Sequence, residues 1–327
     1  MKKVLVVGGG PAGLSAAEAL AGLGFEVYLV EKEDKLGGLP VKESRYKLFP
    51  YEKSPEELLN PLAERVKEKV RVFTGAEVEA VLTDRPPFDV RLTNGETLRV
   101  DALVLATGVK SFDPTRKGEL GFKLVNGVVT NAQLEAMLAR NELKEPGSVA
   151  FVFCVGSRDL QLGPSYAHCC SYGCAHAGML ALELKRRFPS ARVYCFYTDV
   201  RTCSTLERRY YLLPQREGVR YVRGRVARIY EQNGKPVLKF EDTLLGRPSE
   251  LAVDLAVLVL GLEPSEGTKK LARLLSLKQD ESGFIAEERE GVFVAGSCKG
   301  LLTLQEALTD GKATALRAAL YLKGEKT

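Results

Sequence analysis

The sequence contains no apolar run long enough to cross a membrane. A spanning helix needs about 18 consecutive apolar residues, and the apolar start, Val4 to Val7, meets glycines too early to form the core of a signal peptide. Blocks of five or six like charges, typical of nucleic-acid-binding tails, are also missing, and the net charge of +5 is modest for 327 residues. We therefore expect a cytoplasmic protein with no membrane span and no nucleic-acid partner.

Disulfide bonds are poorly supported as well. The seven cysteines are an odd number, and without a secretory signal they favour reduced thiols, metal ligands or redox chemistry. Cys195, Cys203 and Cys298 are scattered, whereas the other four fall close together, at Cys154, Cys169, Cys170 and Cys174. The composition, 45% apolar and 27% charged, is that of a globular chain with room for two hydrophobic cores.

The N-terminal residues carry the pattern of a dinucleotide-binding turn. An apolar strand at residues 3–7 leads into Gly8, Gly10 and Gly13, which form G-x-G-x-x-G, and a helix and a second apolar strand ending at Glu31 follow. The first glycine permits the tight turn, the second lets the backbone approach a pyrophosphate, and the third allows close packing of helix on strand. Amides at the start of the helix face the phosphates. Glu31 can accept hydrogen bonds from both ribose hydroxyls and disfavours a 2′-phosphate.

Further elements follow in a specific order. They are KLGG after Glu31, LRVDALVLATG, GVFVAGSCKG and an amphipathic C-terminal helix. This set resembles the flavoprotein disulfide reductase superfamily over nearly the whole chain. The resemblance implies an α/β fold of two Rossmann-like, FAD/NAD(P)-binding domains of the three-layer ββα type. It implies FAD contacts from Gly8, Gly10, Pro11, Ala12, Gly13, Glu31, Lys32, Gly37, Gly38, Ala106, Thr107, Gly108, Gly296 and Ser297.

The second glycine turn departs from the superfamily pattern at one position. The superfamily usually has an aspartate after this glycine, touching the ribityl chain, where this chain has Ser297 after Gly296. Because serine still donates and accepts hydrogen bonds, we expect flavin binding to survive. Lys299 is a candidate for placing a cation near the flavin ring and raising its potential, and a solvated lysine is the alternative.

The second domain lacks the glycine fingerprint. We expect residues 1–112 and 256–327 to form a discontinuous FAD-binding domain, and 113–255 to form a second β-α-β region. After the strand SVAFVFCVG, the turn reads CVGSRDLQLGPSYAHCCSYGC, which is too long for a pyrophosphate loop and rich in thiols. The sequence therefore provides no evident phosphate cradle for NAD(P)H.

The motif CVGSRD at Cys154, followed by C-S-x-x-C from Cys170 to Cys174, resembles the A-subunit family of heterodisulfide reductase. FYTDVRT at Phe196 to Thr202 and RGR at Arg223 to Arg225 agree with it. The resemblance implies a flavoprotein that passes electrons between FAD and iron-sulfur partner subunits of a cytoplasmic complex. Relatives of this architecture also imply a possible homodimer.

Two departures qualify this resemblance. The ferredoxin-type cysteine segments of long family members are missing, so the chain is similar to the short form of sulfur-oxidising heterodisulfide-reductase-like complexes and to the quinone-interacting oxidoreductase. The family's final cysteine is Ala175 here, and an extra thiol, Cys169, precedes Cys170.

Four thiolates near one loop can bind a [4Fe-4S] cluster, since soft ligands favour iron-sulfur or zinc over hard cations. Cys154, Cys170 and Cys174 match family ligand positions, and Cys169 or His168 could supply the fourth bond if the loop rearranges. Buried thiols without metal are the main alternative. Zinc is a lesser one, because paired C-x-x-C knuckles are missing.

The sequence thus favours an FAD-dependent oxidoreductase, working within a complex, that relays electrons between its flavin and iron-sulfur centres. A stand-alone NAD(P)H-dependent flavin reductase, a flavin-bearing scaffold and a quinone-interacting subunit remain alternatives.

Overall fold

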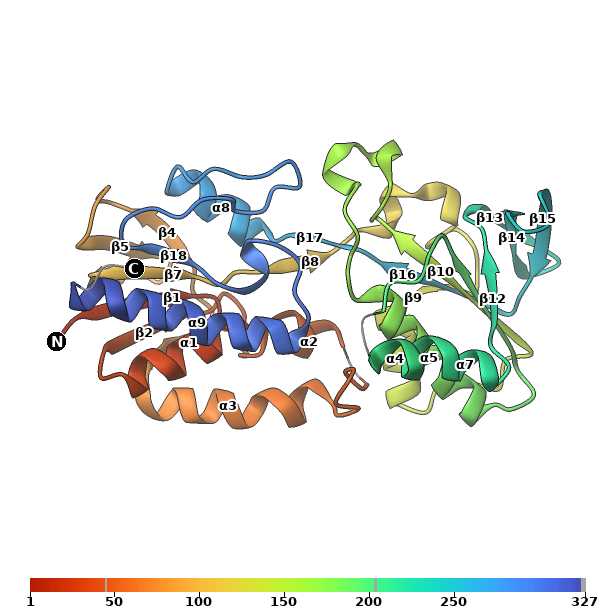
Figure 1. Ribbon diagram of the computed structural model, residues 1–327, viewed down its shortest axis with the longest axis horizontal. Helices are drawn as coiled ribbons and strands as arrows, with labels where there is room; N and C mark the ends of the chain where they lie inside the picture. The colour runs from red at the N-terminus through yellow and green to blue at the C-terminus, as the bar shows by residue number, and fades with distance from the viewer. Residues whose placement is uncertain (45, 203–204, 325–327) are drawn as a thin grey trace. The chain divides into compact units, whose positions relative to one another are not determined.

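The computed structural model describes residues 1–44, 46–202 and 205–324. The chain divides into two compact units (Figure 1). Unit 1 comprises Met1–Glu43, Ser54–Lys110 and Glu263–Thr327, and unit 2 comprises Ser44–Lys53 and Ser111–Leu262. Cys203 lies outside the described residues.

A five-stranded parallel sheet forms the centre of unit 1. Its order is β18 (Val292–Val294), β7 (Ala102–Leu105), β1 (Lys3–Val7), β2 (Glu26–Val30) and β3 (Arg71–Phe73). Because side chains alternate along a strand, Val4 and Val6 face one core while Leu5 and Val7 face the other. This explains why the strand reads as a continuous apolar run.

Each face of that sheet is covered by a different layer (Figure 1). Helices cover one face: α1 (Pro11–Gly22), α3 (Pro55–Lys69) and α9 (Leu304–Lys323). The other face packs against α8 (Glu266–Leu274) and an antiparallel sheet of β4 (Val78–Val81), β5 (Phe88–Leu92) and β6 (Thr97–Val100).

Unit 2 repeats this three-layer plan. Its parallel sheet has the order β12 (Arg220–Arg223), β11 (Arg192–Tyr197), β10 (Ser148–Val155), β16 (Leu255–Leu260) and β9 (Val128–Thr130). One core involves α4 (Asn131–Ala139) and α5 (Gly173–Arg187). The other involves an antiparallel sheet of β13 (Val226–Gln232), β14 (Lys235–Asp242) and β15 (Arg247–Ala252). The predicted fold class, two Rossmann-like domains of the ββα type, is confirmed.

The short elements connect these layers. Strands β8 (Val109–Ser111) and β17 (Leu262–Pro264) pair with each other. The other short segments are α2 (Gly38–Glu43), η1 (Pro114–Arg116), η2 (Gly118–Leu120), η3 (Leu160–Leu162), η4 (Pro164–Tyr166), α6 (Thr205–Glu207), the π-helical turn η5 (Arg208–Leu212), α7 (Leu213–Arg216) and η6 (Gly296–Cys298). Within the described ranges, no helix combines the length and apolarity needed to span a bilayer.

The units divide at different residues from the expected 112 and 256. Strand β16 belongs to the sheet of unit 2, where it lies between β10 and β9. Residues 44–53 also fold onto unit 2, through ion pairs of Lys47 with Glu183 at 3.5 Å and of Glu52 with Arg209 at 2.6 Å. An apolar run indicates a buried strand but cannot specify which of two similar sheets it joins.

Candidate functional site

The first glycine turn of unit 1 requires glycine at two of its positions. Gly8 has φ +111°, and a Cβ there would lie 2.4 Å from the Ala106 carbonyl oxygen. A Cβ at Gly13 would lie 1.8 Å from the Gly8 carbonyl oxygen. Strand β1, helix α1 and the Ala106 turn therefore approach one another as closely as a phosphate-binding turn demands.

The N-terminus of α1 is open, in contrast to those of three other helices. Capping boxes close the starts of α3, α4 and α9. Gly10 caps α1 without a side chain, Pro11 follows as the first helical residue, and the first turn carries no acid. The amide groups of this turn, with the positive end of the helix dipole, suit an anionic phosphate.

Space remains at Gly10 itself. A Cβ there would meet only the Cα of Gly38, at 3.8 Å. The Gly37 amide donates to the Gly9 carbonyl at 2.8 Å, so the KLGG loop closes over the turn. Crowding within the protein therefore does not require glycine at position 10, and the open space suits the approach of a ligand.

The Glu31 carboxylate is buried and fixed at the end of β2. Its two oxygens accept the Gly9 amide at 2.7 Å and the Glu33 amide at 2.9 Å. This orientation holds the acid beside the glycine turn, where a ribose would bind. The Lys32 side chain is half exposed, and its ammonium lies 3.9 Å from the Glu33 carboxylate. The structure therefore fixes Lys32 less firmly at the ligand site than it fixes Glu31.

A polar cluster supports the turn from Ala106 to Gly108. The Ser265 hydroxyl donates to the Thr107 carbonyl at 2.9 Å, and the Gly108 amide donates to the Cys298 sulfur at 3.0 Å. Thr107 and Thr268 hydroxyls lie 2.9 Å apart. Cys298 is fully buried and 190 residues from Gly108, so its role here was missed by sequence reasoning.

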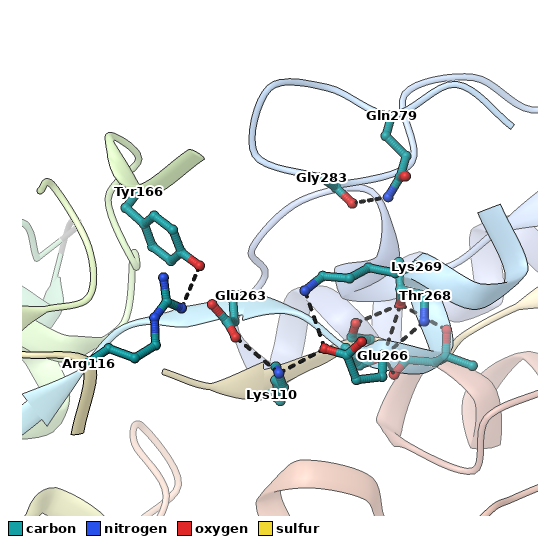
Figure 2. A network of polar contacts seen from close by, with 12 residues as sticks. Lys110, Arg116, Tyr166, Glu263, Glu266, Thr268, Lys269, Gln279 and Gly283 are labelled. Carbon is teal, nitrogen blue, oxygen red and sulfur yellow. Dashed lines mark hydrogen bonds and ion pairs between the residues drawn. The ribbon is translucent and has the colours of Figure 1, made fainter. Parts of the chain in front are cut away.

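Ion pairs extend this cluster, as Figure 2 shows. Lys110 lies between Glu266 at 2.9 Å and Glu263 at 3.2 Å. The hydrogen bond that Lys110 donates to Glu266 raises the pKa of Lys110 and lowers the pKa of Glu266. Both groups are largely exposed, so we assign them an orienting role and only a small contribution to stability.

Asp310 of α9 supplies a carboxylate at the second glycine turn. It accepts the Gly296 amide at 2.7 Å and pairs with the Lys299 ammonium at 2.7 Å. Ser297 accepts the Leu302 amide at 3.3 Å. Lys299 is thus partly neutralised, and its proposed effect on a flavin would be modulated by Asp310.

Sequence reasoning missed Asp310, although a signal was present. Gly311 interrupts the amphipathic helix directly after it, and a Cβ at Gly311 would lie 2.3 Å from the Ala12 carbonyl oxygen. This glycine allows α9 to approach the first turn of α1. An Asp-Gly pair inside a segment with an otherwise regular amphipathic helix pattern therefore indicates the close contact between α9 and α1.

The predicted thiol cluster lies within unit 2. Cys154 is at the end of β10 with φ +61°, Cys169 and Cys170 are in the loop before α5, and Cys174 is in the first turn of α5. Cys170 donates a hydrogen bond that lowers the pKa of Cys169 to about 5, while burial raises the pKa of Cys174 to about 11. No three His, Cys, Asp or Glu side chains of the described residues are placed to hold a metal ion.

The two histidines have structural partners. His176 is buried beside Glu135, 2.7 Å from its carboxylate, and the Ser44 hydroxyl also donates to that carboxylate. His168 Nε2 lies 3.1 Å from the Leu262 carbonyl oxygen. His168 would have to give up this contact to act as a fourth metal ligand.

The turn after β10 differs from the glycine turn of unit 1 in its connection, because β10 ends at Val155 and α5 begins only at Gly173. Gly156 has φ +79°, and a Cβ there would lie 2.0 Å from the Phe112 ring. The aromatic ring fills the space beside the first glycine of this turn. A cavity of about 380 Å³ lies at the end of β10, lined in part by Cys154, Lys117, Arg158 and Arg225.

In metal-free protein we expect Cys169 to be the thiol most readily alkylated near neutral pH. The thiolate is the nucleophile, and because the pKa is lowered to about 5, Cys169 is ionised above that pH. Its rate with iodoacetamide, followed by peptide mass spectrometry, should rise through about pH 5 and then level off. Buried Cys195 should stay unlabelled. A Cys169 rate still rising above pH 8, near the ordinary thiol range of about 8.5, would contradict this assignment.

Comparison with known proteins supports the predicted family resemblance. Residues 2–156 match the family described as pyridine nucleotide-disulphide oxidoreductase. The A chain of the ferredoxin/F(420)H(2)-dependent CoB-CoM heterodisulfide reductase of Methanosarcina acetivorans is 33% identical over 75% of this chain and 32% of that protein. The second iron-sulfur A-type subunit of CoB--CoM heterodisulfide reductase from Methanopyrus kandleri is 26% identical over 98% of this chain and 64% of that protein. The chain therefore spans about a third of the first of these relatives.

Solved structures agree on the fold. Thioredoxin reductase from T. acidophilum has a TM-score of 0.69 at 18% identity, covering 99% of both chains. The Lactococcus lactis enzyme has a TM-score of 0.69 at 17% identity, covering 99% of this chain and 100% of that one.

Fold and site together define an oxidoreductase of the pyridine nucleotide-disulphide type, whose fold implies FAD binding. Within that superfamily, its relatives include A-type subunits of heterodisulfide reductase, at 26% to 33% identity. The predicted family and enzyme class are confirmed.

Proposed function

We propose that this chain is the FAD-containing electron-transfer subunit of a cytoplasmic heterodisulfide-reductase-like complex. It would relay electrons between its flavin and iron-sulfur centres in thiol, disulfide or sulfur metabolism. The observation that carries this proposal is the contrast between unit 1, where the glycine turn leads directly into α1, and unit 2, where a long segment without the glycine fingerprint separates β10 from α5. This contrast favours one bound dinucleotide, with electrons passed onward to protein partners.

The residues of unit 1 fit FAD. Amides of the first turn of α1 would hold the pyrophosphate, and Glu31 would hold the adenosine ribose. The three further segments assigned to the flavin contain Gly38 at the start of α2, Thr107 after β7 and Ser297 in η6. Bound flavin supplies two-electron chemistry and can also transfer electrons singly. The protein's contribution is to bind and orient the cofactor and to set the charges around it.

An iron-sulfur cluster on the four thiols fits by ligand chemistry but not by their present arrangement. Soft thiolates suit such a cluster, and charge interactions link Cys154 with Cys169, Cys170 and Cys174. However, the described residues contain no ready metal-binding group. Cluster assembly would require the loop before α5 to rearrange, and we derive no electron-transfer step through it.

Iron and acid-labile sulfide on anaerobically purified protein would test the cluster. We expect Cys154→Ala and Cys174→Ala to lose iron, because each variant removes one thiolate ligand of the cluster. Both should retain FAD, because the residues assigned to FAD lie in unit 1. Cys195→Ala is the matched control, since Cys195 is a buried thiol that the cluster does not use. Parent protein without iron would restrict the iron-sulfur centres to partner subunits.

A stand-alone NAD(P)H-dependent reductase is the second candidate, and a quinone-interacting subunit is a third. In unit 2, the missing glycine fingerprint and the long segment between β10 and α5 argue against a nicotinamide cofactor. Anaerobic mixing with NADH or NADPH distinguishes the candidates. Rapid bleaching of the flavin without partners would favour the stand-alone reductase, whereas slow bleaching supports the relay. A homodimer, implied by similar architectures, would be tested by light scattering.

A further inference from the structure

Residues 201–228 of unit 2 have an unusual charge composition. They contain eight arginines and no lysine, against two acids, Glu207 and Glu217. Unit 2 as a whole carries 24 Lys and Arg against 16 Asp and Glu, so it accounts for the positive charge of the chain. Exclusive use of arginine is informative, because its planar guanidinium makes bidentate pairs with carboxylates.

Ion pairs within the protein occupy only some of these arginines. Arg201 pairs with Asp199 at 3.5 Å, Arg209 with Glu52 at 2.6 Å and Arg225 with Asp159 at 3.1 Å. The other five are exposed, and no described acid lies within ion-pair distance of them: Arg208, Arg216, Arg220, Arg223 and Arg228. Unpaired guanidinium groups of this density indicate a surface suited to an anionic partner.

Strand β12 belongs to this arginine-rich segment, residues 201–228, and is the edge strand of the parallel sheet of unit 2. Among the strands of the described ranges, β12 pairs with β11 alone in the order given for that sheet. Arg220 and Arg223 are its first and last residues, and both are exposed. The Arg223 carbonyl already accepts the Thr243 amide at 2.9 Å, and the rest of this edge offers main-chain hydrogen-bonding groups to an extended polypeptide.

Aromatic side chains join the helical segment η5 to this edge. The rings of Tyr211 and Tyr221 have centroids 4.9 Å apart, and the centroids of Tyr197 and Tyr221 are 5.9 Å apart. All three are partly exposed, and Leu212 is 40% exposed. Tyrosine and arginine are among the residues that contribute most often to protein-protein binding energy. We define the arginine edge as β12 together with Arg208, Tyr211, Leu212 and Arg216.

We propose that the arginine edge docks an acidic, extended segment of the protein that exchanges electrons with this chain. Carboxylates of that segment would pair with the guanidinium groups that have no acid partner, Arg220 among them although it lies over the Tyr194 ring, while its backbone adds to β12. A polypeptide suits the surface better than a nucleic acid does, because only a polypeptide can continue the main-chain pairing of the sheet. The role of this partner in electron transfer rests on the proposed function.

The test uses the full chain and a labelled peptide of about ten residues that alternates glutamate and threonine. Fluorescence anisotropy gives its Kd at about 20 mM and about 200 mM salt, where screening differs strongly. We expect Arg220→Glu/Arg223→Glu to weaken binding by about tenfold or more at low salt. Arg220→Gln/Arg223→Gln, which introduces no like charges, should weaken it less but in the same direction.

The control is Lys144→Glu/Arg186→Glu, which makes the same change in net charge at two exposed positions of unit 2 outside the arginine edge. It should change the peptide Kd by less than about twofold. Equal weakening by both charge reversals, no binding of the peptide, or tighter binding of a DNA duplex or of phosphatidylserine vesicles would overturn the proposal. Because the assay measures binding alone, a chain without FAD or iron would refute the proposed function and leave this result standing.

Discussion

Gly10→Ala should abolish tight FAD binding while leaving the fold intact. The backbone at Gly10 has φ −75° and ψ −177°, which alanine adopts readily, and a Cβ there has no protein atom closer than 3.8 Å. The added methyl group would instead occupy the space that the pyrophosphate needs. We expect FAD affinity to fall by at least about tenfold, or about 1.4 kcal/mol. Flavin absorbance after gel filtration and titration of the apoprotein with FAD measure this loss.

The matched control is Gly22→Ala, at the other end of the same helix. A Cβ at Gly22 would meet no atom within 4 Å. Alanine should therefore stabilise the helix slightly, by up to about 1 kcal/mol, and leave FAD binding unchanged. If Gly10→Ala binds FAD as tightly as the parent, the pyrophosphate does not approach this turn, and the assigned cofactor site is wrong.

Gly178→Ala should destabilise unit 2 strongly. Gly178 lies in α5, and a Cβ there would lie 1.8 Å from the Tyr210 carbonyl oxygen of η5. Because that oxygen belongs to the backbone, the helix and η5 must move apart. Such overpacking costs about 1–3 kcal/mol, or more where the backbone cannot relax. Denaturant unfolding followed by far-ultraviolet circular dichroism measures the change in stability.

Gly118→Ala is the corresponding control, since a Cβ at Gly118 has no neighbour within 4 Å. It should leave the unfolding midpoint nearly unchanged. The Gly178 variant should also weaken binding at the arginine edge, because η5 carries Arg208 and Tyr211. Parent-like stability of Gly178→Ala would show that α5 and η5 are separated more widely than the structure indicates.

Local patterns were sufficient for the N-terminal half of the cofactor site. The strand, glycine turn, helix and second strand are contiguous in sequence, so each glycine could be assigned a position before the fold was known. The absence of a second glycine fingerprint could also be recognised from the local sequence. By contrast, the Phe112 ring that fills the space at Gly156 comes from a distant segment, and no local signal marks it.

Contacts between segments far apart in sequence account for the other features that the sequence did not predict. Asp310 reaches the Gly296 amide because α9 packs against the start of α1. Strand β16 joins the sheet of unit 2 although its apolar sequence would suit either sheet. The hydrogen bond between the thiols of Cys169 and Cys170, which separates their pKa values in opposite directions, depends on side-chain geometry.

The amino-acid sequence by itself determined the class of fold, the family and the first dinucleotide turn, because hydrophobic periodicity and glycine spacing act over short stretches of chain. The tertiary structure alone decided where the units divide, which residues support the cofactor loops, and how the arginines gather around one sheet edge. These features depend on packing between residues far apart in sequence, and short-range patterns do not contain that information.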